Sequence, residues 1–501
     1  MKYAGIVSFA SKLFGMVIGL VFQITVTRRL SPTDFGLYQL VLGVVSYFVI
    51  PASIISYWSA RESARGAKVI PTALAAGFGL SLLSSAAYLA LSFVISRGMG
   101  LDMLPFLVGT FMLVPMLENT IIQAIVATVK PRVAGYVESI RELMRAVAGF
   151  VFVILLKLEL AGALLSWAVS FLSAFAAGLV LIREKLEGGF RQEAIKRWMG
   201  GWWLPFLNSA AGLLSSVDIL IVAALSSMLA VSYISASDVI CSVVFYTIAL
   251  VVALYPQMLV GGSGKNVDEA FRFWLLFSVP ITLGICSLAP AFAYVLRKEY
   301  AVAYLVIILR TLASFFVTFG DIMVYAASGH EKLSPESGSS GKPLASSSTL
   351  KMVVVKLVSG LLYLGVIFLV LHSTTLGDVG SAILVALTYA LVSVMSLIPL
   401  YSIARSLLRF RLPMESLARY ALYFVPSLVL IWVFYPTGAF SERILDVLIN
   451  LFPIILASAV LYFSVALALD PYFRQMVQSF ISRLTRRKQH SSGYESQRSV
   501  R

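Results

Sequence analysis

Charged residues are scarce in this sequence of 501 residues, at 13% of the total, whereas soluble globular chains carry roughly 25%. Cysteine and histidine are rarer still, with two and three copies. Cys241 and Cys286 fall inside apolar stretches, so we expect neither a disulfide framework nor a thiolate metal site. The histidines are far apart, which argues against zinc. What remains is apolar: 59% of the residues are hydrophobic and the mean hydropathy is +0.91.

Apolar stretches recur along the whole chain and are long enough to cross a membrane. Cutting the sequence at its polar clusters leaves stretches of roughly 17–28 residues, and about 20 residues of helix span the hydrocarbon core. These stretches are apolar all round rather than alternating, which predicts helices and excludes a barrel. The predicted fold class is an all-α polytopic membrane protein of about fourteen transmembrane helices. They lie near 4–27, 35–58, 69–96, 103–128, 138–156, 160–182, 201–225, 234–259, 270–294, 302–328, 351–371, 379–403, 417–435 and 444–468.

Lys and Arg are distributed unevenly over the loops that connect these stretches. The loops on the side of the N-terminus hold about four times as many as the loops opposite, and such an excess marks the cytoplasmic side. We therefore predict a multi-pass protein of the cell membrane with both termini in the cytoplasm. The net charge of +15 is spread over helix ends rather than gathered on one soluble face, so we expect no nucleic acid partner.

A short internal repeat relates the two halves of the chain. The segment 30–38, LSPTDFGLY, matches the segment 225–233, LSSMLAVSY, at Leu, Ser and Tyr, and the same offset places Gln23 opposite Asp218. The first segment follows the first predicted helix and the second follows the seventh. The two halves would therefore run the same way through the membrane, as parallel repeats.

The end of the first helix carries a resemblance to a known family. Thr27 to Tyr38, TRRLSPTDFGLY, resembles the beginning of polysaccharide and oligosaccharide-lipid flippases of the multidrug/oligosaccharidyl-lipid/polysaccharide exporter superfamily. Leu204-Pro205-Phe206, Asp218 before an apolar run, and Ala326-Ala327-Ser328-Gly329 add to a resemblance that covers nearly the whole chain. The departure is the loop 331–349, which is longer and richer in Ser than the family pattern.

This resemblance implies two pseudo-symmetric six-helix bundles around a central cavity that opens alternately to each side. We expect an N-terminal bundle at 1–198, a second bundle at 199–405, two additional helices at 406–470, and a cytoplasmic tail at 471–501 that is amphipathic or disordered. The loop 331–349 is too rich in Ser, Gly and Pro to pack, so it is expected to be disordered, as is the chain after His490.

Polar residues inside the apolar stretches are the best pointers to a transport site. A charge at mid-bilayer costs roughly 2.5–3.5 kcal/mol on insertion scales, so it usually faces a cavity or a partner. Steps of three and four residues place three sets on single helix faces. These are Ser8, Lys12, Gly15, Gly19 and Gln23; Asn208, Ala211, Ser215 and Asp218; and Arg310, Ser314, Thr318, Asp321 and Tyr325. The first two sets also have a structural interpretation: a close helix contact through glycines with a snorkelling Lys12, and a buried ion pair or hydrogen bond at Asp218.

Arg310 and Asp321 are about 16 Å apart along their helix, so we expect each to have another partner. Arg145 adds a cation near the cytoplasmic mouth, unless it only belongs to the positive-inside signal, while Lys356 suits a snorkelling anchor. Glu118, Asn119, Gln123 and Asp238 are further candidates. We predict a cavity site with no catalytic or metal-binding residue, formed by Lys12, Gln23, Arg145, Asn208, Asp218, Arg310 and Asp321.

The candidate residues suit an anionic, sugar-bearing lipid. A phosphate cannot enter hydrocarbon uncompensated, Lys and Arg supply the opposite charge, and amides and hydroxyls exchange hydrogen bonds with sugars. We therefore predict a flippase whose partners are a lipid-linked glycan and membrane lipids, with no cofactor. One alternative is a cation-coupled multidrug exporter that uses Asp218 as its H⁺ or Na⁺ site. Several of the candidate cavity residues are cationic, which argues against this alternative. The other is a membrane glycosyltransferase, but the outer loops are short and their acidic residues isolated, so we predict no enzyme.

Overall fold

The computed structural model describes residues 2–130, 133–251, 258, 264–331, 347–435, 443–478 and 482. Within these ranges the chain is helical and contains no strand, which confirms the all-α fold class. The interior of the loop predicted to be disordered, residues 332–346, lies outside the described residues, as does the chain after His490. The bounds of the α-helices are α1 Lys2–Arg29, α2 Pro32–Val49, α3 Ala52–Ala64, α4 Ile70–Met99, α5 Leu104–Val129, α6 Ala134–Gly149, α7 Glu159–Ile182, α8 Gln192–Gly200, α9 Trp203–Leu213, α10 Asp218–Leu225, α11 Met228–Tyr246, α13 Gly264–Ser287, α14 Ala289–Leu296, α15 Tyr304–His330, α17 Ser348–Ser373, α18 Asp378–Leu408, α19 Met414–Val433 and α20 Ile444–Leu469.

Several predicted membrane spans are bent or broken. In the described residues 10 helices are long and apolar enough to cross a membrane, or up to 12 if each of two bent pairs forms one span; the predicted number of fourteen is not confirmed. α2 and α3 meet at 51°, at a break that contains Pro51, because proline cannot donate the hydrogen bond that would continue the helix. Residues Pro205–Leu213 of α9 meet α10 at 42°, through the 3-10 turn Leu214–Val217. This second break places Asp218 at a helix N-terminus.

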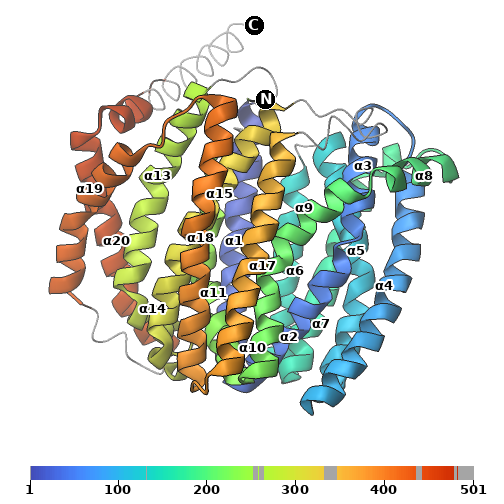
Figure 1. Ribbon diagram of the computed structural model, residues 1–501, viewed down its shortest axis with the longest axis horizontal. Helices are drawn as coiled ribbons and strands as arrows, with labels where there is room; N and C mark the ends of the chain where they lie inside the picture. The colour runs from blue at the N-terminus through green and yellow to red at the C-terminus, as the bar shows by residue number, and fades with distance from the viewer. Residues whose placement is uncertain are drawn as a thin grey trace, which may run out of the picture.

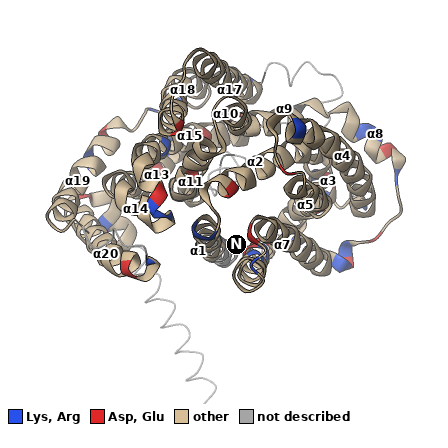
Figure 2. Ribbon diagram, turned by 90° about the horizontal axis from the view of Figure 1, so that it is seen from below, with Lys and Arg blue, Asp and Glu red and all other residues tan. Residues whose placement is uncertain are grey.

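The helices stand side by side and run roughly parallel to one another (Figure 1). We call α1–α7 the first bundle and α9–α18 the second bundle. Seen along the helices, α4, α5 and α7 lie on one side and α13, α15 and α18 on the other, with α1 and α2 between them (Figure 2). The bundles meet where α2 packs along α11 and where α1 touches α11 and α14. α19 and α20 pack on each other and on α13, at the edge of the second bundle.

The repeated Leu-Ser segments begin the two helices that join the bundles. The Ser31 hydroxyl accepts a hydrogen bond from the Asp34 N–H at 3.1 Å and caps α2, and Ser227 caps α11 in the same way. Ser31 therefore corresponds to Ser227 by its role, one residue beyond the register of the sequence match. A Cβ on Gly36 would lie 2.1 Å from the Met228 carbonyl oxygen. This glycine of the segment 27–38, which we call the signature, therefore permits a backbone contact between the bundles.

A buried carboxylate ties the last two helices to the second bundle. Asp470, which follows α20, is 0% exposed and accepts hydrogen bonds of 2.8 Å from Arg272 of α13 and Tyr420 of α19. Three helices are thus joined at one carboxylate, which satisfies the rule that buried charges need partners.

Glu331 joins the end of α15 to the start of α17, on either side of the undescribed loop. Its carboxylate accepts hydrogen bonds from the Ser348 N–H at 2.6 Å and from the N–H and hydroxyl of Thr349 at 2.9 and 2.8 Å. Burial raises the pKa of Glu331, but these hydrogen bonds outweigh it and hold the pKa below its usual range. The end of α15 and the start of α17 are therefore held together by Glu331, despite the long loop between them.

Candidate functional site

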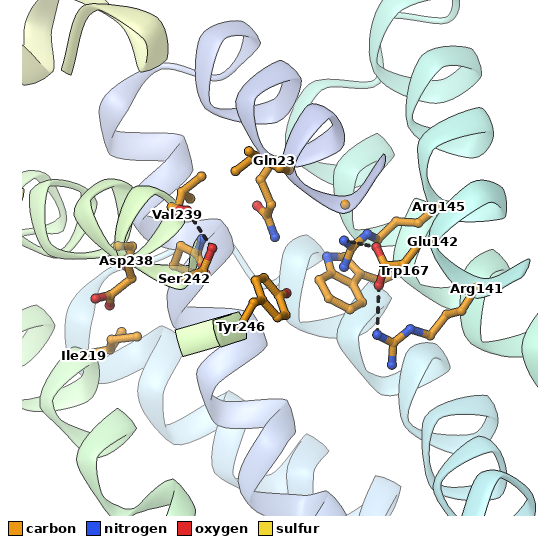
Figure 3. Close-up of a pocket in the computed structure, with 14 residues that line it drawn as sticks. Gln23, Arg141, Glu142, Arg145, Trp167, Ile219, Asp238, Val239, Ser242 and Tyr246 are labelled. Atoms are coloured by element: carbon orange, nitrogen blue, oxygen red, sulfur yellow. Dashed lines mark hydrogen bonds and ion pairs between the residues drawn. The ribbon is translucent and has the colours of Figure 1, made fainter. Parts of the chain in front are cut away.

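A cavity of about 290 Å³ lies between the two bundles. Figure 3 shows side chains that line it: Gln23, Glu142, Arg145 and Trp167 come from the first bundle, and face residues of the second bundle that include Asp238. The lining is mixed, with guanidinium groups, carboxylates, amides, hydroxyls and aromatic rings. Such a surface can bind a ligand that carries both charge and hydrogen-bonding groups.

Four charged residues form a chain of ion pairs along one face of α6, the α6 ion cluster: Glu138, Arg141, Glu142 and Arg145. Their steps of three and four residues place them on one helix face. Arg141 pairs with Glu138 and, at 2.8 Å, with Glu142. Glu142 also pairs with Arg145 through its other oxygen. One carboxylate therefore bridges two arginines at the cavity wall.

Aromatic rings hold Arg145 in place beside the cavity. Its guanidinium carbon lies 4.2 Å from the centre of the Trp167 ring and 5.0 Å from that of Phe22, at distances where a cation is attracted to a ring face. Trp167 is itself oriented by a 2.6 Å hydrogen bond to the hydroxyl of Tyr38, the last residue of the signature. The signature thus supports the cavity wall as well as the contact between the bundles.

The glycine stripe of α1 covers the α6 ion cluster. A Cβ on Gly19 would lie 2.6 Å from Glu142 Oε2 and 2.7 Å from Arg145 Nη2, and one on Gly15 would lie 3.5 Å from Glu142 Cγ. The close helix contact expected from these glycines is therefore present. Gly19 and Gln23 also line the cavity, so the stripe lies at a helix contact and at the cavity wall.

A second group of charges is assembled from several helices of the second bundle, and we call Asp218, Arg310, Tyr363 and Asp238 the Asp218 cluster. Arg310 of α15 and the Tyr363 hydroxyl of α17 each donate a 2.6 Å hydrogen bond to Asp218 Oδ2. Asp218 Oδ1 accepts from the Ile219 N–H at 2.7 Å, and the N-terminus of α10 favours a negative charge there. Both oxygens of this buried carboxylate are thus satisfied.

Asp238 of α11 connects the Asp218 cluster with the cavity. One carboxylate oxygen lies 3.7 Å from Arg310 Nε, and 47% of the side chain is exposed. It lines the cavity, whereas Arg310 and Asp218 lie behind it. Asp238 therefore presents a negative charge to whatever occupies the cavity.

The structure brings some of the predicted site residues together and separates others. Gln23 and Arg145 line the cavity, and Asp218 and Arg310 form the buried ion pair that was the structural alternative for Asp218. Asp321 pairs with Lys356 on α17. It does not pair with Arg310, which is too far away along α15. Asn208 is exposed and does not line this cavity. The side chain of Lys12 lies outside the described residues.

Sequence reasoning missed Glu138, Glu142, Trp167 and Tyr363. For the two glutamates the signal was present, since opposite charges at steps of three and four residues predict ion pairs along a helix. No comparable signal marked Tyr363, whose partner Asp218 lies 145 positions away in the sequence. Among the described residues no group of three or more His, Cys, Asp or Glu could hold a metal ion.

Arginines also join the bundles on the side where α1 ends. Arg28 donates hydrogen bonds of 3.1 Å to the carbonyl oxygens of Tyr294 and Val295, near the end of α14. Arg297, just after α14, donates one of 2.6 Å to the Leu30 carbonyl just after α1. We call Arg28 and Arg297 the arginine clasp. Helix C-termini favour cations, so each arginine stabilises the end of the other bundle's helix.

Comparison with known proteins gives a likeness of fold. No protein-family model and no curated protein matches the sequence. Among solved structures, the lipid II flippase MurJ in an inward closed conformation aligns with a TM-score of 0.62 and 14% identity over 94% of this chain and 100% of that chain. An inward-facing multidrug resistance MATE family transporter of the MOP superfamily aligns with a TM-score of 0.57 and 13% identity over 80% and 98%. A MOP superfamily transporter from Pyrococcus furiosus aligns with a TM-score of 0.54 and 14% identity over 80% and 96%. The chain therefore shares its fold with the MurJ flippase and the MATE transporter.

Proposed function

We propose that this protein is a flippase that moves a lipid-linked oligosaccharide or polysaccharide unit from the cytoplasmic to the outer leaflet by alternating access. The observation that carries the proposal is the mixed lining of the cavity between the bundles, where two arginines lie beside amides, hydroxyls and aromatic rings. The N-terminus would lie in the cytoplasm, as the positive-inside distribution indicates.

The cavity lining contains groups that suit each part of such a substrate, the phosphate and the sugars. A phosphate or pyrophosphate needs charge-assisted hydrogen bonds once it leaves water, and guanidinium groups supply them in pairs. Sugar hydroxyls need both donors and acceptors, which Gln23, Ser235 and Ser242 offer. The rings of Trp167 and Tyr246 add flat apolar surface for sugar faces. No bond has to be made or broken in such a site.

The contacts between the bundles support a rocking motion. On the side where α1 ends, the bundles are joined by the arginine clasp and by the backbone contact at Gly36. Guanidinium groups and carbonyl oxygens hydrogen-bond to water when they separate, which lowers the cost of opening this end. The buried rings of Phe35 and Tyr300 also pack across it, so opening exposes some apolar surface. The MurJ alignment also spans more of the chain than the MATE alignment, 94% against 80%, which favours a flippase.

A cation-coupled multidrug exporter of the same superfamily remains the rival, and Asp238 is the observation that favours it. Its carboxylate faces the cavity and lies 3.7 Å from Arg310, so a cationic drug or a coupling H⁺ or Na⁺ would find a negative charge there. Asp218, the ion site first expected for this alternative, is less suited because Arg310, Tyr363 and the Ile219 N–H already occupy both of its oxygens.

Reconstitution of the purified protein in vesicles separates the two functions. A fluorescent lipid-linked oligosaccharide placed in the inner leaflet should become accessible to a membrane-impermeant glycosidase only in vesicles that contain the protein. Arg145→Gln should slow this movement, while Arg97→Gln, at the surface of α4, should leave it unchanged. Extrusion of ethidium without any movement of the glycan lipid would establish the multidrug exporter instead.

A further inference from the structure

We infer that Glu142 is an internal counter-ion, which the anionic group of the substrate displaces from Arg141 and Arg145. The inference rests on the proposed function and names the group of the substrate that is recognised, a phosphate or pyrophosphate. Glu142 bridges both arginines: Oε1 accepts from Arg141 at 2.8 Å, and Oε2 accepts from Arg145. A phosphate presents the same arrangement, at least two negative oxygens to two guanidinium groups.

The arginines keep other partners when Glu142 leaves. Arg145 stays between the rings of Trp167 and Phe22, and Arg141 stays paired with Glu138. Glu138 is itself fixed by a 2.8 Å hydrogen bond from Gln123. The receiving groups are therefore held in place independently of the carboxylate that occupies them, so an incoming anion meets a preorganised pair.

Both arginines also have N–H donors that make no hydrogen bond within the described part of the chain. The Nε atoms of Arg141 and Arg145 are buried and have no hydrogen-bond partner among the described residues. A guanidinium group carries five N–H donors, and a carboxylate with two oxygens cannot satisfy both groups. A phosphate or pyrophosphate brings more oxygens than Glu142, so exchange satisfies more of the buried donors than the internal pair does.

The charges around the cavity explain why an internal anion is useful. With Glu142 in place, the α6 ion cluster contains as many carboxylates as guanidinium groups. A buried arginine without a partner is costly, and Glu142 prevents that cost in the empty protein. The Asp218 cluster contains one more carboxylate than guanidinium, so it offers an anion no net attraction. An anion gains access to the α6 ion cluster when Glu142 gives way.

Binding of a prenyl pyrophosphate tests the exchange. We would measure geranyl pyrophosphate binding to the full chain in lipid nanodiscs, with geraniol and geranylamine as uncharged and cationic probes. Glu142→Gln keeps the size of the side chain but removes the competing charge, so affinity for geranyl pyrophosphate should rise about ten-fold or more. Glu184→Gln is the control: it removes a carboxylate from an ion pair with Lys130, outside the cavity lining and the α6 ion cluster, and should change the affinity little.

Thermal unfolding provides a second readout that a purely structural role would not move. Inorganic pyrophosphate should raise the Tm of Glu142→Gln more than that of the unsubstituted protein, and should not do so for the double variant Glu142→Gln with Arg145→Gln. The inference is overturned if Glu142→Gln binds geranyl pyrophosphate no more tightly, if Glu184→Gln gains as much, or if pyrophosphate restores no stability. Its failure is distinguishable from failure of the proposed function, because the latter requires that the unsubstituted protein moves no glycan lipid in vesicles.

Discussion

The two charged clusters beside the cavity are built in different ways. All members of the α6 ion cluster lie on one helix, whereas the Asp218 cluster combines residues of α10, α11, α15 and α17. Burial does not distinguish them, since Arg145 and Arg310 are both 5% exposed. The difference teaches that a cluster on one helix can rearrange while its helix stays in place, whereas a cluster made by four helices holds those helices together. We assign exchange with substrate to the first and support of the second bundle to the other.

The largest loss of stability is expected for a substitution in the Asp218 cluster. Asp218→Asn removes the charge that neutralises Arg310 and weakens the junction of three helices, so it should lower the free energy of unfolding by about 3–5 kcal/mol. Thermal or denaturant unfolding in detergent measures it. Adding Arg310→Met should restore part of the loss, because the double variant no longer buries a guanidinium group that lacks the Asp218 carboxylate. Equal stability of the single variant and the unsubstituted protein would contradict the role of a junction.

A smaller loss of stability is expected at the α6 ion cluster. Glu142→Gln leaves Arg145 with its aromatic rings and Arg141 with Glu138, so the cost should be about 1–3 kcal/mol, the range for one unsatisfied buried partner. The same unfolding assay compares it with Asp218→Asn. If Glu142→Gln were the more damaging of the two, the distinction between a local cluster and an assembled one would be wrong.

The next largest effect is expected at the arginine clasp, which joins the two bundles, whereas the two charged clusters each lie within one bundle. Arg28→Gln with Arg297→Gln should favour opening by about 1 kcal/mol, or about five-fold in population, because hydrogen bonds that are replaced by bonds to water contribute little net free energy. Spin labels at positions 29 and 298, in a variant with Cys241 and Cys286 replaced by Ser, should show a new longer distance. The control Arg97→Gln should show none. An unchanged distribution in the double variant would mean that the clasp does not hold this end closed.

The smallest effect is expected at Glu331, a charge outside the membrane-spanning helices. Its folded pKa is lowered, so its contribution to stability is present above the ordinary Glu value of about 4.3 and is lost as the pH falls through the folded pKa. Glu331→Gln should cost about 0.5–1 kcal/mol near neutral pH, at the lower end of helix-cap values because the group is partly exposed. Unfolding as a function of pH measures the difference, which should vanish in acid; a constant difference would refute the linkage.

The sequence predicted the helices and many of the polar positions, because both depend on local patterns. Apolar length predicted the all-α fold, and steps of three and four residues placed Gly19 and Gln23 on the face that meets the cavity. The partners could not be predicted in this way. Arg310 and Asp218 are 92 positions apart, and their pairing depends on how α10 and α15 pack. The number of fourteen spans is also not settled by apolar length, because breaks such as that at Pro51 divide single stretches.

Photo-crosslinking from inside the cavity tests the central claim most directly, that an anionic glycan lipid passes between the bundles. A diazirine-bearing amino acid at position 242 lies in the cavity lining, and one at position 111, where Phe111 is 75% exposed, provides the control. After irradiation in membranes that contain lipid-linked oligosaccharide, we predict an adduct at 242 and none at 111, and geranyl pyrophosphate should reduce the adduct more than geranylamine does. Equal adducts at both positions, or competition by geranylamine alone, would contradict the account.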